Sequence, residues 1–302
     1  MVRDNSLSSK ILSLVVHCTV VILLIVTLYP VLHVASVSFS RGSAVMKNEV
    51  TFYPKGFNLN AYDRIFSTPK IPRGYMNSLL YTSVGTAINL LLTACMAYAL
   101  SKKRLTFRSF YTTLVIVTMF FGGGLIPTFL LVKSLGMYNT LWALVIPTAI
   151  STWNLIIMRT FFMGIPTELE ESAFLDGAND ITVLVRIVLP LSKAAIATIG
   201  LFYMVGHWNS WFPAVIYLKD SEKYPLQVYL RQIVIQNILD EELGATFQAQ
   251  MLETIGSDID DYITVEKIKY ATLFASLLPM LIVYPLLQKY FVKGIMIGSL
   301  KG

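Results

Sequence analysis

Two long apolar runs of this chain are separated by the polar stretch Glu171-Ser172-Ala173-Phe174-Leu175-Asp176-Gly177, and Ile187-Val188-Leu189-Pro190 follows after nine further residues. Ionised carboxylates are costly inside a bilayer. If the flanking runs cross a membrane, the stretch between them must therefore lie at the membrane surface. There it meets water or a partner protein, and we expect it to receive force from that partner.

The composition of the chain is that of an integral membrane protein. The 302 residues are 55% hydrophobic and only 14% charged, whereas soluble domains carry about 25% charged residues. The net charge of +6 comes from basic residues beside apolar runs. Flanking charge of this kind is typical of membrane spans, and we expect no nucleic-acid partner. Cys18 and Cys95 fall inside apolar runs, where cysteine serves as a small hydrophobe.

Six segments are long and apolar enough to cross a bilayer, which takes about 20 residues. The first exceeds the apolar core of a cleaved signal peptide, so we expect it to be a retained span. The predicted fold is all-α, a polytopic membrane protein with six transmembrane helices. Several segments contain Pro or Gly, either as ordinary kinks or as breaks that line a pathway. The six segments are Ile11–Val37, Met76–Leu100, Phe110–Val132, Leu141–Met163, Leu191–Leu218 and Tyr270–Val292.

The charges of the short loops predict the orientation. The loop over residues 101–109 holds four basic residues, whereas the loops over 38–75 and 219–269 are long. Because short basic loops stay on the cytoplasmic side, we expect both termini to be cytoplasmic. The loop 219–269 should form an external cap with its own amphipathic helix. Its apolar positions are Leu226, Leu230, Ile233, Ile235 and Ile238.

The polar segment between the fourth and fifth spans has the signals of two short helices. Thr167, with a glutamate three residues later, fits a capping box, and Gly177 can end the first helix in the left-handed conformation. The second helix should cover Asp180–Val188 and stop before Pro190. The helix dipole stabilises acidic residues in the first turn. We place Glu168, Glu170 and Glu171 there.

The spacing Glu171-x-Ala173-x-x-Asp176-Gly177, nine residues, then Ile187-x-Leu189-Pro190 resembles the cytoplasmic coupling motif, the EAA motif, of permease subunits of ATP-binding-cassette (ABC) importers. Ser172 stands where the commonest form has alanine. Further stretches resemble the carbohydrate branch of that family, of the maltose type (MalG-like). They are Asn77-Ser78-Leu79, Ala97–Ser101, Ile126-Pro127-Thr128, Leu135–Thr140, Trp208-Asn209, Trp211-Phe212-Pro213 and the tail from Lys293-Gly294 to Lys301-Gly302.

The resemblance implies one permease domain over residues 1–302 with the type I importer (MetI-like) fold. Its core would cover about 76–292, with cytoplasmic coupling helices at about 167–188, the external loop at 219–269 and a tail at 293–302 that could enter the ATPase interface or hold anionic lipid. The coupling helices would dock on a cytoplasmic ATPase. The implied coupling residues are Glu168, Glu170, Glu171, Ala173, Asp176, Gly177, Ile187, Leu189 and Pro190.

The resemblance also implies the partners. These are a second homologous permease, two ATPase subunits and an extracytoplasmic solute-binding protein, assembled at the bacterial cytoplasmic membrane. This chain would bind no cofactor, because ATP and Mg²⁺ would be held by the ATPase subunits. It has no Gly-x-x-x-x-Gly-Lys-[Ser/Thr] loop with which to hydrolyse ATP itself.

The cargo predicted from the resemblance is a saccharide. The chain resembles permeases for complex and acidic oligosaccharides, such as alginate or aldouronate fragments, and six basic residues between the first two spans could attract such a cargo or merely be a solvated surface. Sugars are bound by aromatic faces and polar side chains, and the fifth span supplies both, although Trp and Tyr are also common interfacial anchors. The candidate substrate-pathway residues are Tyr203, His207, Trp208, Asn209 and Trp211.

Other functions fit less well. An intramembrane enzyme would need a catalytic constellation, but there is no His-Glu-x-x-His run and no Gly-x-Ser-x-Gly elbow. An ion-coupled secondary transporter would bury ionisable residues in its spans, whereas no acidic residue lies at the centre of a predicted span. The open alternatives are a permease for a non-sugar solute and, less favoured, a secondary transporter.

Overall fold

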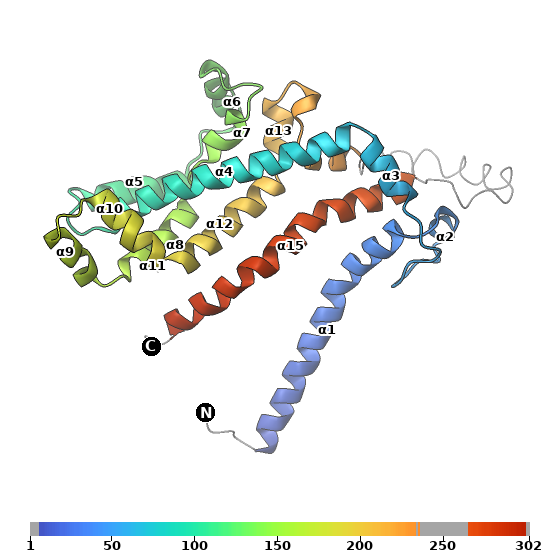
Figure 1. Ribbon diagram of the computed structural model, residues 1–302, viewed down its shortest axis with the longest axis horizontal. Coiled ribbons are helices and arrows are strands. Elements are labelled where there is room, and N and C mark those ends of the chain that lie inside the picture. The colour runs from blue at the N-terminus through green and yellow to red at the C-terminus, as the bar shows by residue number, and fades with distance from the viewer. Residues whose placement is uncertain (1–5, 234, 236–264, 300–302) are drawn as a thin grey trace. The chain divides into compact units, whose positions relative to one another are not determined.

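The computed structural model describes residues 6–233, 235 and 265–299, and every regular element in these ranges is a helix (Figure 1). A helix over residues 226–233 follows η3. The other elements are α1 (Leu7–Ser38), α2 (Gly42–Met46), α3 (Asn60–Ser67), α4 (Lys70–Ser101), α5 (Arg108–Phe120), α6 (Leu125–Ser134), α7 (Trp142–Val145), η1 (Ile146–Thr148), α8 (Thr152–Met163), α9 (Thr167–Leu175), α10 (Asp180–Val183), η2 (Leu184–Val188), α11 (Leu189–Leu191), α12 (Lys193–Trp208), α13 (Phe212–Tyr217), η3 (Ser221–Lys223) and α15 (Val265–Ser299).

The six predicted membrane crossings correspond to three single helices and three bent pairs of helices. In the described part of the chain, α1, α4 and residues Glu266–Leu286 of α15 are each long and apolar enough to cross a bilayer alone. Three bent pairs pass the same test together: α5 with α6 (114°), Trp142–Thr148 with α8 (56°), and Asp180–Leu191 with α12 (86°). If each pair is one span, the total is six. The predicted all-α membrane fold is confirmed.

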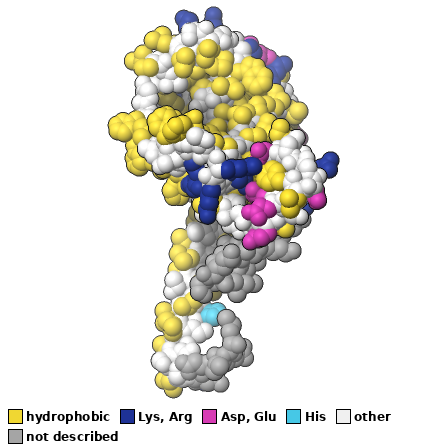
Figure 2. All heavy atoms as spheres, turned by 90° about the vertical axis from the view of Figure 1, so that its left-hand side faces the viewer, with side chains coloured by type: hydrophobic (Ala, Val, Ile, Leu, Met, Phe, Trp, Pro, Cys, Tyr) yellow, Lys and Arg dark blue, Asp and Glu magenta, His cyan; other side chains and the backbone are white. Residues whose placement is uncertain are grey.

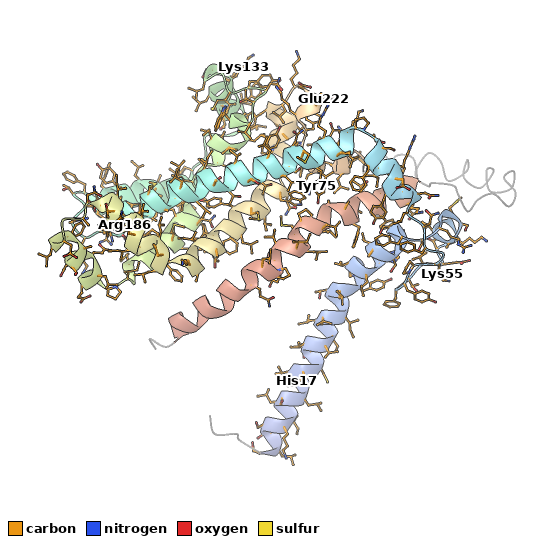
Figure 3. All side chains as sticks on the ribbon, viewed as in Figure 1. His17, Lys55, Tyr75, Lys133, Arg186 and Glu222 are labelled. Carbon is orange, nitrogen blue, oxygen red and sulfur yellow. The ribbon has the colours of Figure 1, made fainter. Side chains whose placement is uncertain are left out.

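Helix α1 is built for contact with lipid. Its apolar side chains are exposed around the helix, and its polar side chains bond to its own backbone. The Thr19 and Thr27 hydroxyls donate to the carbonyls of Val15 and Leu23 at 2.9 and 2.8 Å, and His17 (labelled in Figure 3) bonds within the helix in the same way. Polar groups inside a bilayer need such internal partners.

The predicted span Phe110–Val132 is broken at its glycine run and is formed by two helices, α5 and α6. The chain leaves the helix at Phe121, and α6 starts only after the three glycines 122–124. Gly124 has φ +83° and ψ 166°, a conformation that is essentially restricted to glycine. The glycine run therefore turns α6 away from α5 by 114°.

The predicted span Leu191–Leu218 is also interrupted. Helix α12 ends at Trp208, and α13 begins at Phe212. Pro213 lies in the first turn of α13, where its missing N–H costs nothing. In the middle of a continuous helix the same proline would remove a hydrogen bond and clash with the preceding turn.

The described residues form two compact units, and the first consists of the described residues within 1–72 and 230–278. Its small core contains Val37, Ala44, Val45 and Val50. The Phe39 ring stacks on Tyr62 at 5.0 Å between centroids. The Tyr62 hydroxyl donates to Ser38 Oγ at 2.8 Å, and burial raises the pKa of this phenol. The segment after α1 is thus anchored by aromatic packing.

The second unit consists of the described residues within 73–229 and 279–302. Its main core joins α4, α5, α8, α10, η2 and α12, so that the polar segment of residues 167–188 rests directly on it. The buried members are Ala94, Ala97, Tyr98, Leu100, Val115, Leu155, Met158, Phe162, Val183, Leu184, Val188, Ile199 and Tyr203.

The start of the loop predicted to be an external cap is fastened to α4. The Asn77 amide donates to the carbonyls of Glu222 and Tyr224 at 2.8 and 3.1 Å, and Ser78 Oγ accepts the N–H of Leu226 at 2.9 Å. The helix over residues 226–233 agrees with the predicted periodicity. Ile238 and the rest of that loop up to residue 264 lie outside the described residues, as do residues 300–302 of the predicted tail. The external side of the loop stays a prediction.

The turn between α5 and α6 can be tested with Gly124→Ala. An added Cβ would meet only Pro127 Cδ, at an ordinary 3.8 Å, so that backbone strain alone should lower the free energy of unfolding by about 1–3 kcal/mol. Denaturant titration in detergent measures this loss. Gly122→Ala is the matched control, because a Cβ there has open space and no left-handed φ. Equal stability of the two variants would contradict the role of Gly124.

Candidate coupling segment and membrane cavity

The first helix of the coupling segment, defined here as residues 167–191, is α9. Glu168 and Glu170 lie in its first turn as predicted, but Glu171 follows that turn. The predicted capping box is wrong, because the N-cap is Pro166 and has no side-chain cap. The carboxylate that would have closed the box, that of Glu170, is instead paired with Lys102, in the loop that follows α4.

Gly177 ends this helix as predicted. Its φ of +83° lies in the left-handed region, and its N–H donates to the Phe174 carbonyl at 3.0 Å. A Cβ at this position would have nothing within 4 Å. The backbone conformation, and not a lack of space, therefore favours glycine here.

The second helix continues past the predicted stop before Pro190. It begins at α10, where Asn179 Oδ1 accepts the N–H of Thr182 at 2.8 Å. It then widens into the π-helix η2, in which Leu189 N–H bonds to the Leu184 carbonyl, and runs on through α11. Pro190 fits because it lies in the first turn of α11. The break comes two residues later, at Ser192, where the chain bends by 86° into α12.

The coupling segment has a core face and a free face. Of the nine predicted coupling residues, Glu170 is buried, and Ala173, Ile187 and Leu189 pack against the core. The other five are exposed. They are Glu168, Glu171, Asp176, Gly177 and Pro190.

The free face also carries apolar side chains that sequence reasoning did not single out. Leu175 is 90% exposed and Ile181 is 72% exposed, and these two residues flank Gly177 in sequence. An exposed apolar pair rimmed by carboxylates is typical of a protein contact.

Two basic residues, Lys102 and Arg104, hold the coupling segment against the end of α4, and we call them the basic clamp. Lys102 Nζ pairs with Glu170, and the two side chains are only 13% and 10% exposed. Arg104 pairs with Asp180 and lies 4.6 Å from the Phe174 ring centre. Figure 2 shows Lys and Arg side chains gathered beside Asp and Glu at this end of the molecule.

The clamp is reinforced from α4 itself. The Tyr98 hydroxyl donates to Asp180 Oδ1 at 3.1 Å, and the Lys102 ammonium lies 4.2 Å from the Tyr98 ring centre. Sequence reasoning took the basic loop only as an orientation signal. The two ion pairs join this loop to the first turns of α9 and α10, 68 and 76 residues away, so that no local sequence pattern indicates them.

A cavity of about 320 Å³ lies in the second unit. Two of the predicted substrate-pathway residues, Tyr203 and His207, line it. Trp208 does not, since it is buried against Tyr75, and neither Asn209 nor Trp211 is among the lining residues. The complete lining is Asn89, Leu144, Thr148, Ser151, Asn154, Phe202, Tyr203, Gly206, His207, Ser210 and Pro213.

Hydrogen bonds fix the polar wall of this cavity. Asn89 Nδ2 donates to the Thr148 carbonyl at 2.8 Å, which leaves its Oδ1 to accept from His207 Nε2 at 2.9 Å. Because an amide oxygen can only accept, Nε2 of His207 carries a proton and donates it to this bond. The Tyr203 hydroxyl accepts the N–H of Ser151 at 3.0 Å and bonds Thr93 Oγ1 at 2.7 Å.

Gly85 allows the histidine ring to lie this close to α4. A Cβ at Gly85 would be 2.5 Å from His207 Nε2. Sequence reasoning missed the cavity residues Asn89, Ser151 and Asn154. The available signal was a polar side chain inside a predicted span, which is unusual in lipid and marks a functional interior.

No group of three or more His, Cys, Asp or Glu side chains that could hold a metal ion occurs in the described ranges. The cavity wall there is made of hydroxyls, amides, one imidazole and apolar groups. It is suited to hydrogen-bonding a neutral or polar solute.

The chain is an all-helical membrane protein. A surface segment is held against its core, and a polar cavity lies between its helices. This combination is typical of a transport permease. A family model described as "Binding-protein-dependent transport system inner membrane component" matches residues 89–297, and the chain belongs to this family. It is a permease subunit of an ABC importer and not an enzyme, because the ATPase of such importers is a separate subunit. The resemblance read from the coupling motif is confirmed.

Relatives match along nearly the whole chain. The polygalacturonan/rhamnogalacturonan transport system permease protein YtcP of Bacillus subtilis is 42% identical over 98% of this chain and 100% of its own length. Protein LplC of the same organism is 45% identical over 92% of this chain and 90% of its own. A crystal structure of a bacterial ABC transporter for import of the acidic polysaccharide alginate includes a chain with a TM-score of 0.83 and 33% identity, covering 95% of this chain and 99% of that one. The predicted MetI-like fold is confirmed.

The buried clamp pair can be tested with Lys102→Met. Removing the ammonium leaves the Glu170 carboxylate buried without its partner, which should lower the free energy of unfolding by about 3 kcal/mol. Adding Glu170→Met should recover most of that loss, because the uncompensated charge is removed. The matched control is Lys103→Met, whose side chain is exposed and whose effect should stay within about 0.5 kcal/mol. Equal losses for Lys102→Met and Lys103→Met in denaturant titration would rule out a structural clamp.

Proposed function

We propose that this chain is the permease half of an importer for oligosaccharides, including acidic ones such as alginate or polygalacturonan fragments. The observation that carries the cargo class is the pair of matches to YtcP and to the alginate importer chain, each over at least 95% of this chain. Alginate is an acidic polysaccharide, and the YtcP system transports polygalacturonan and rhamnogalacturonan, both of which contain acidic sugar units. A neutral saccharide or a non-sugar solute is the alternative cargo.

The proposed partners are a second homologous permease, two ATPase subunits and an extracytoplasmic solute-binding protein. Both termini and the coupling segment would face the cytoplasm, in agreement with the four basic residues of loop 101–109. The exposed Leu175 and Ile181 would enter an apolar cleft of an ATPase subunit, and Glu171 and Asp176 would meet basic side chains at its rim.

The basic clamp would pass the movement of the ATPase to the membrane helices. Closure of the ATPase subunits on ATP can shift the permease only if the closed dimer favours one permease state. A segment tied to α4 by Lys102 and Arg104, and to the core by Val183 and Val188, would move together with those helices.

The cavity lined by Tyr203 and His207 is the proposed contribution of this subunit to the substrate pathway. Its volume of about 320 Å³ is at the lower end of small-molecule sites. No Lys or Arg side chain lines it. The carboxylates of an acidic cargo would therefore be met by hydroxyl and amide donors here, or by the second permease.

The basic residues between the first two spans give this cargo little support. Arg73 is paired with Glu222, and Lys55 lies 3.8 Å from Glu49. Their charge is partly neutralised, so that we assign the preference for acidic cargo to the binding protein and the pathway, not to this surface.

Docking of the coupling segment is tested by Leu175→Asp. Because this side chain is 90% exposed, the permease itself should fold normally. A charge placed in an apolar cleft should weaken retention of the ATPase subunits at least about tenfold, measured by co-purification from membranes. The control is Tyr53→Asp, at a 65% exposed apolar position in the first unit. Unchanged retention in Leu175→Asp would remove the proposed docking face.

The cargo is tested by ATPase stimulation of the reconstituted complex with its binding protein, using a panel of acidic and neutral oligosaccharides, amino acids and peptides. We expect stimulation by acidic oligosaccharides. Gly85→Ala should reduce saccharide-dependent uptake at least about tenfold, because the added methyl displaces His207 and breaks its bond to Asn89.

Gly164→Ala, where a Cβ comes no closer than 3.4 Å to its neighbours, is the control for Gly85→Ala. Stimulation by amino acids or peptides and by no saccharide would overturn the cargo class. Uptake driven by an ion gradient without the ATPase subunits would favour the secondary transporter instead.

A further inference from the structure

A second cavity, of about 370 Å³, lies at the end of the second unit that carries the coupling segment. It is lined by Arg108, Ser109, Thr112 and Thr113 of α5 and by Arg159 of α8. No acidic side chain lines it. We call it the arginine cavity.

The two guanidinium groups of the arginine cavity have no acidic partner in the part of the chain that the structure describes, since no carboxylate there lies within ion-pair distance of Arg108 or Arg159. Arg159 Nε donates to the Leu100 carbonyl at 2.9 Å, and Arg108 Nη2 makes a long contact of 3.9 Å to Met163 Sδ. Each guanidinium has five N–H donors, so most of them remain available to a ligand.

A half-buried arginine usually has an acidic partner, so that the absence of one beside Arg108 and Arg159 among the described residues points to a ligand. Both side chains are intermediate in exposure, and two like charges at one cavity repel each other in a region of reduced dielectric. The hydroxyls of Ser109 and Thr113 are further donors, whereas the Thr112 hydroxyl already donates to the Arg108 carbonyl at 2.8 Å. The site is complementary to an anion with several oxygen acceptors, such as a phosphate group.

The surroundings of the arginine cavity are those of a membrane interface. Phe107 and Phe110, beside Arg108, are 74% and 62% exposed, and exposed aromatic side chains of this kind concentrate at the headgroup level. One and two turns further along α5 from Thr113, on the same face, Val117 and Phe120 are exposed as well. An apolar strip thus leads from the cavity toward the bilayer interior.

We propose that the arginine cavity binds the phosphate headgroup of an anionic phospholipid, with Arg108 and Arg159 on the phosphate and the acyl chains along Val117 and Phe120. The apolar strip selects a lipid over a free phosphate ion. It also selects a lipid over an acidic peptide, which would leave Phe110 and Phe120 facing water.

The bound headgroup would act on the part of the fold that carries the coupling segment. Arg159 is bonded to the carbonyl of Leu100, two residues before the clamp residue Lys102. A phosphate held between α5 and α8 would therefore bring together the helices next to the basic clamp. Anionic lipid should raise the coupling of ATP hydrolysis to uptake.

The test uses the full permease complex in neutral detergent and counts bound lipid by native mass spectrometry, with phosphatidylglycerol and phosphatidylcholine of equal chain length. We expect the wild-type complex to retain phosphatidylglycerol preferentially. Arg108→Gln and Arg159→Gln should each weaken retention at least about fivefold. Arg108→Gln keeps the result interpretable if loss of the Arg159 bond to Leu100 impairs folding.

Lys103→Gln is the charge-matched control, because this exposed lysine belongs to the same loop but does not line the cavity. An equal loss of lipid in Lys103→Gln would mean diffuse attraction and would overturn the proposal. So would wild-type retention in both arginine variants, or equal retention of the two lipids. Complete displacement by excess inorganic phosphate would overturn the lipid as the source of the phosphate. Loss of the lipid on addition of the ATPase subunits would mean that a partner occupies the cavity, and would overturn it as well.

Discussion

The buried ion pair between Lys102 and Glu170 is the contact on which the coupling segment depends. It joins the residue directly after α4 to the first turn of α9, although the two residues are 68 positions apart in the chain. Without it, a short helix with a mostly polar surface would have little to hold it against the core. With it, the acidic segment becomes an extension of a membrane helix. The exposed apolar pair Leu175 and Ile181 is thereby presented on a rigid support.

The same helix, α4, connects this support to the cavity lined by Tyr203 and His207. Asn89 and Gly85 contact His207 along one face of α4, and Tyr98 reaches Asp180 at its far end. A displacement of the coupling segment therefore does not need a chain of small side-chain changes to reach the cavity. One rigid helix spans the distance, which is the simplest physical form of coupling between two sites.

The sequence alone predicted the features that arise from local chemistry. The apolar runs gave the helical membrane fold, and the left-handed turn at Gly177 followed from glycine geometry. Features that depend on distant partners could not be read in this way. The capping box is absent because Pro166 takes the N-cap position, and Glu170 is paired with the distant Lys102 instead. The glycine run 122–124 indicated a break in its span, but not the 114° turn that it makes. Of the predicted pathway residues, Tyr203 and His207 line the cavity, whereas Trp208 is buried in the core.

The π-helix of Leu184–Val188 has a consequence for the register of the chain. A π-turn accommodates one more residue than an α-turn, and each residue turns an α-helix by about 100°. The extra residue lets Val183 and Val188 both point into the core while Asp180, one turn earlier, still faces Arg104. A single-residue deletion here would therefore restore a regular α-turn with little rotation of the residues before it, whereas a deletion within the regular helix α12 would rotate the residues before it by about 100°. The wide turn is therefore the place in this segment where the chain can best lose one residue without changing which side chains face the core.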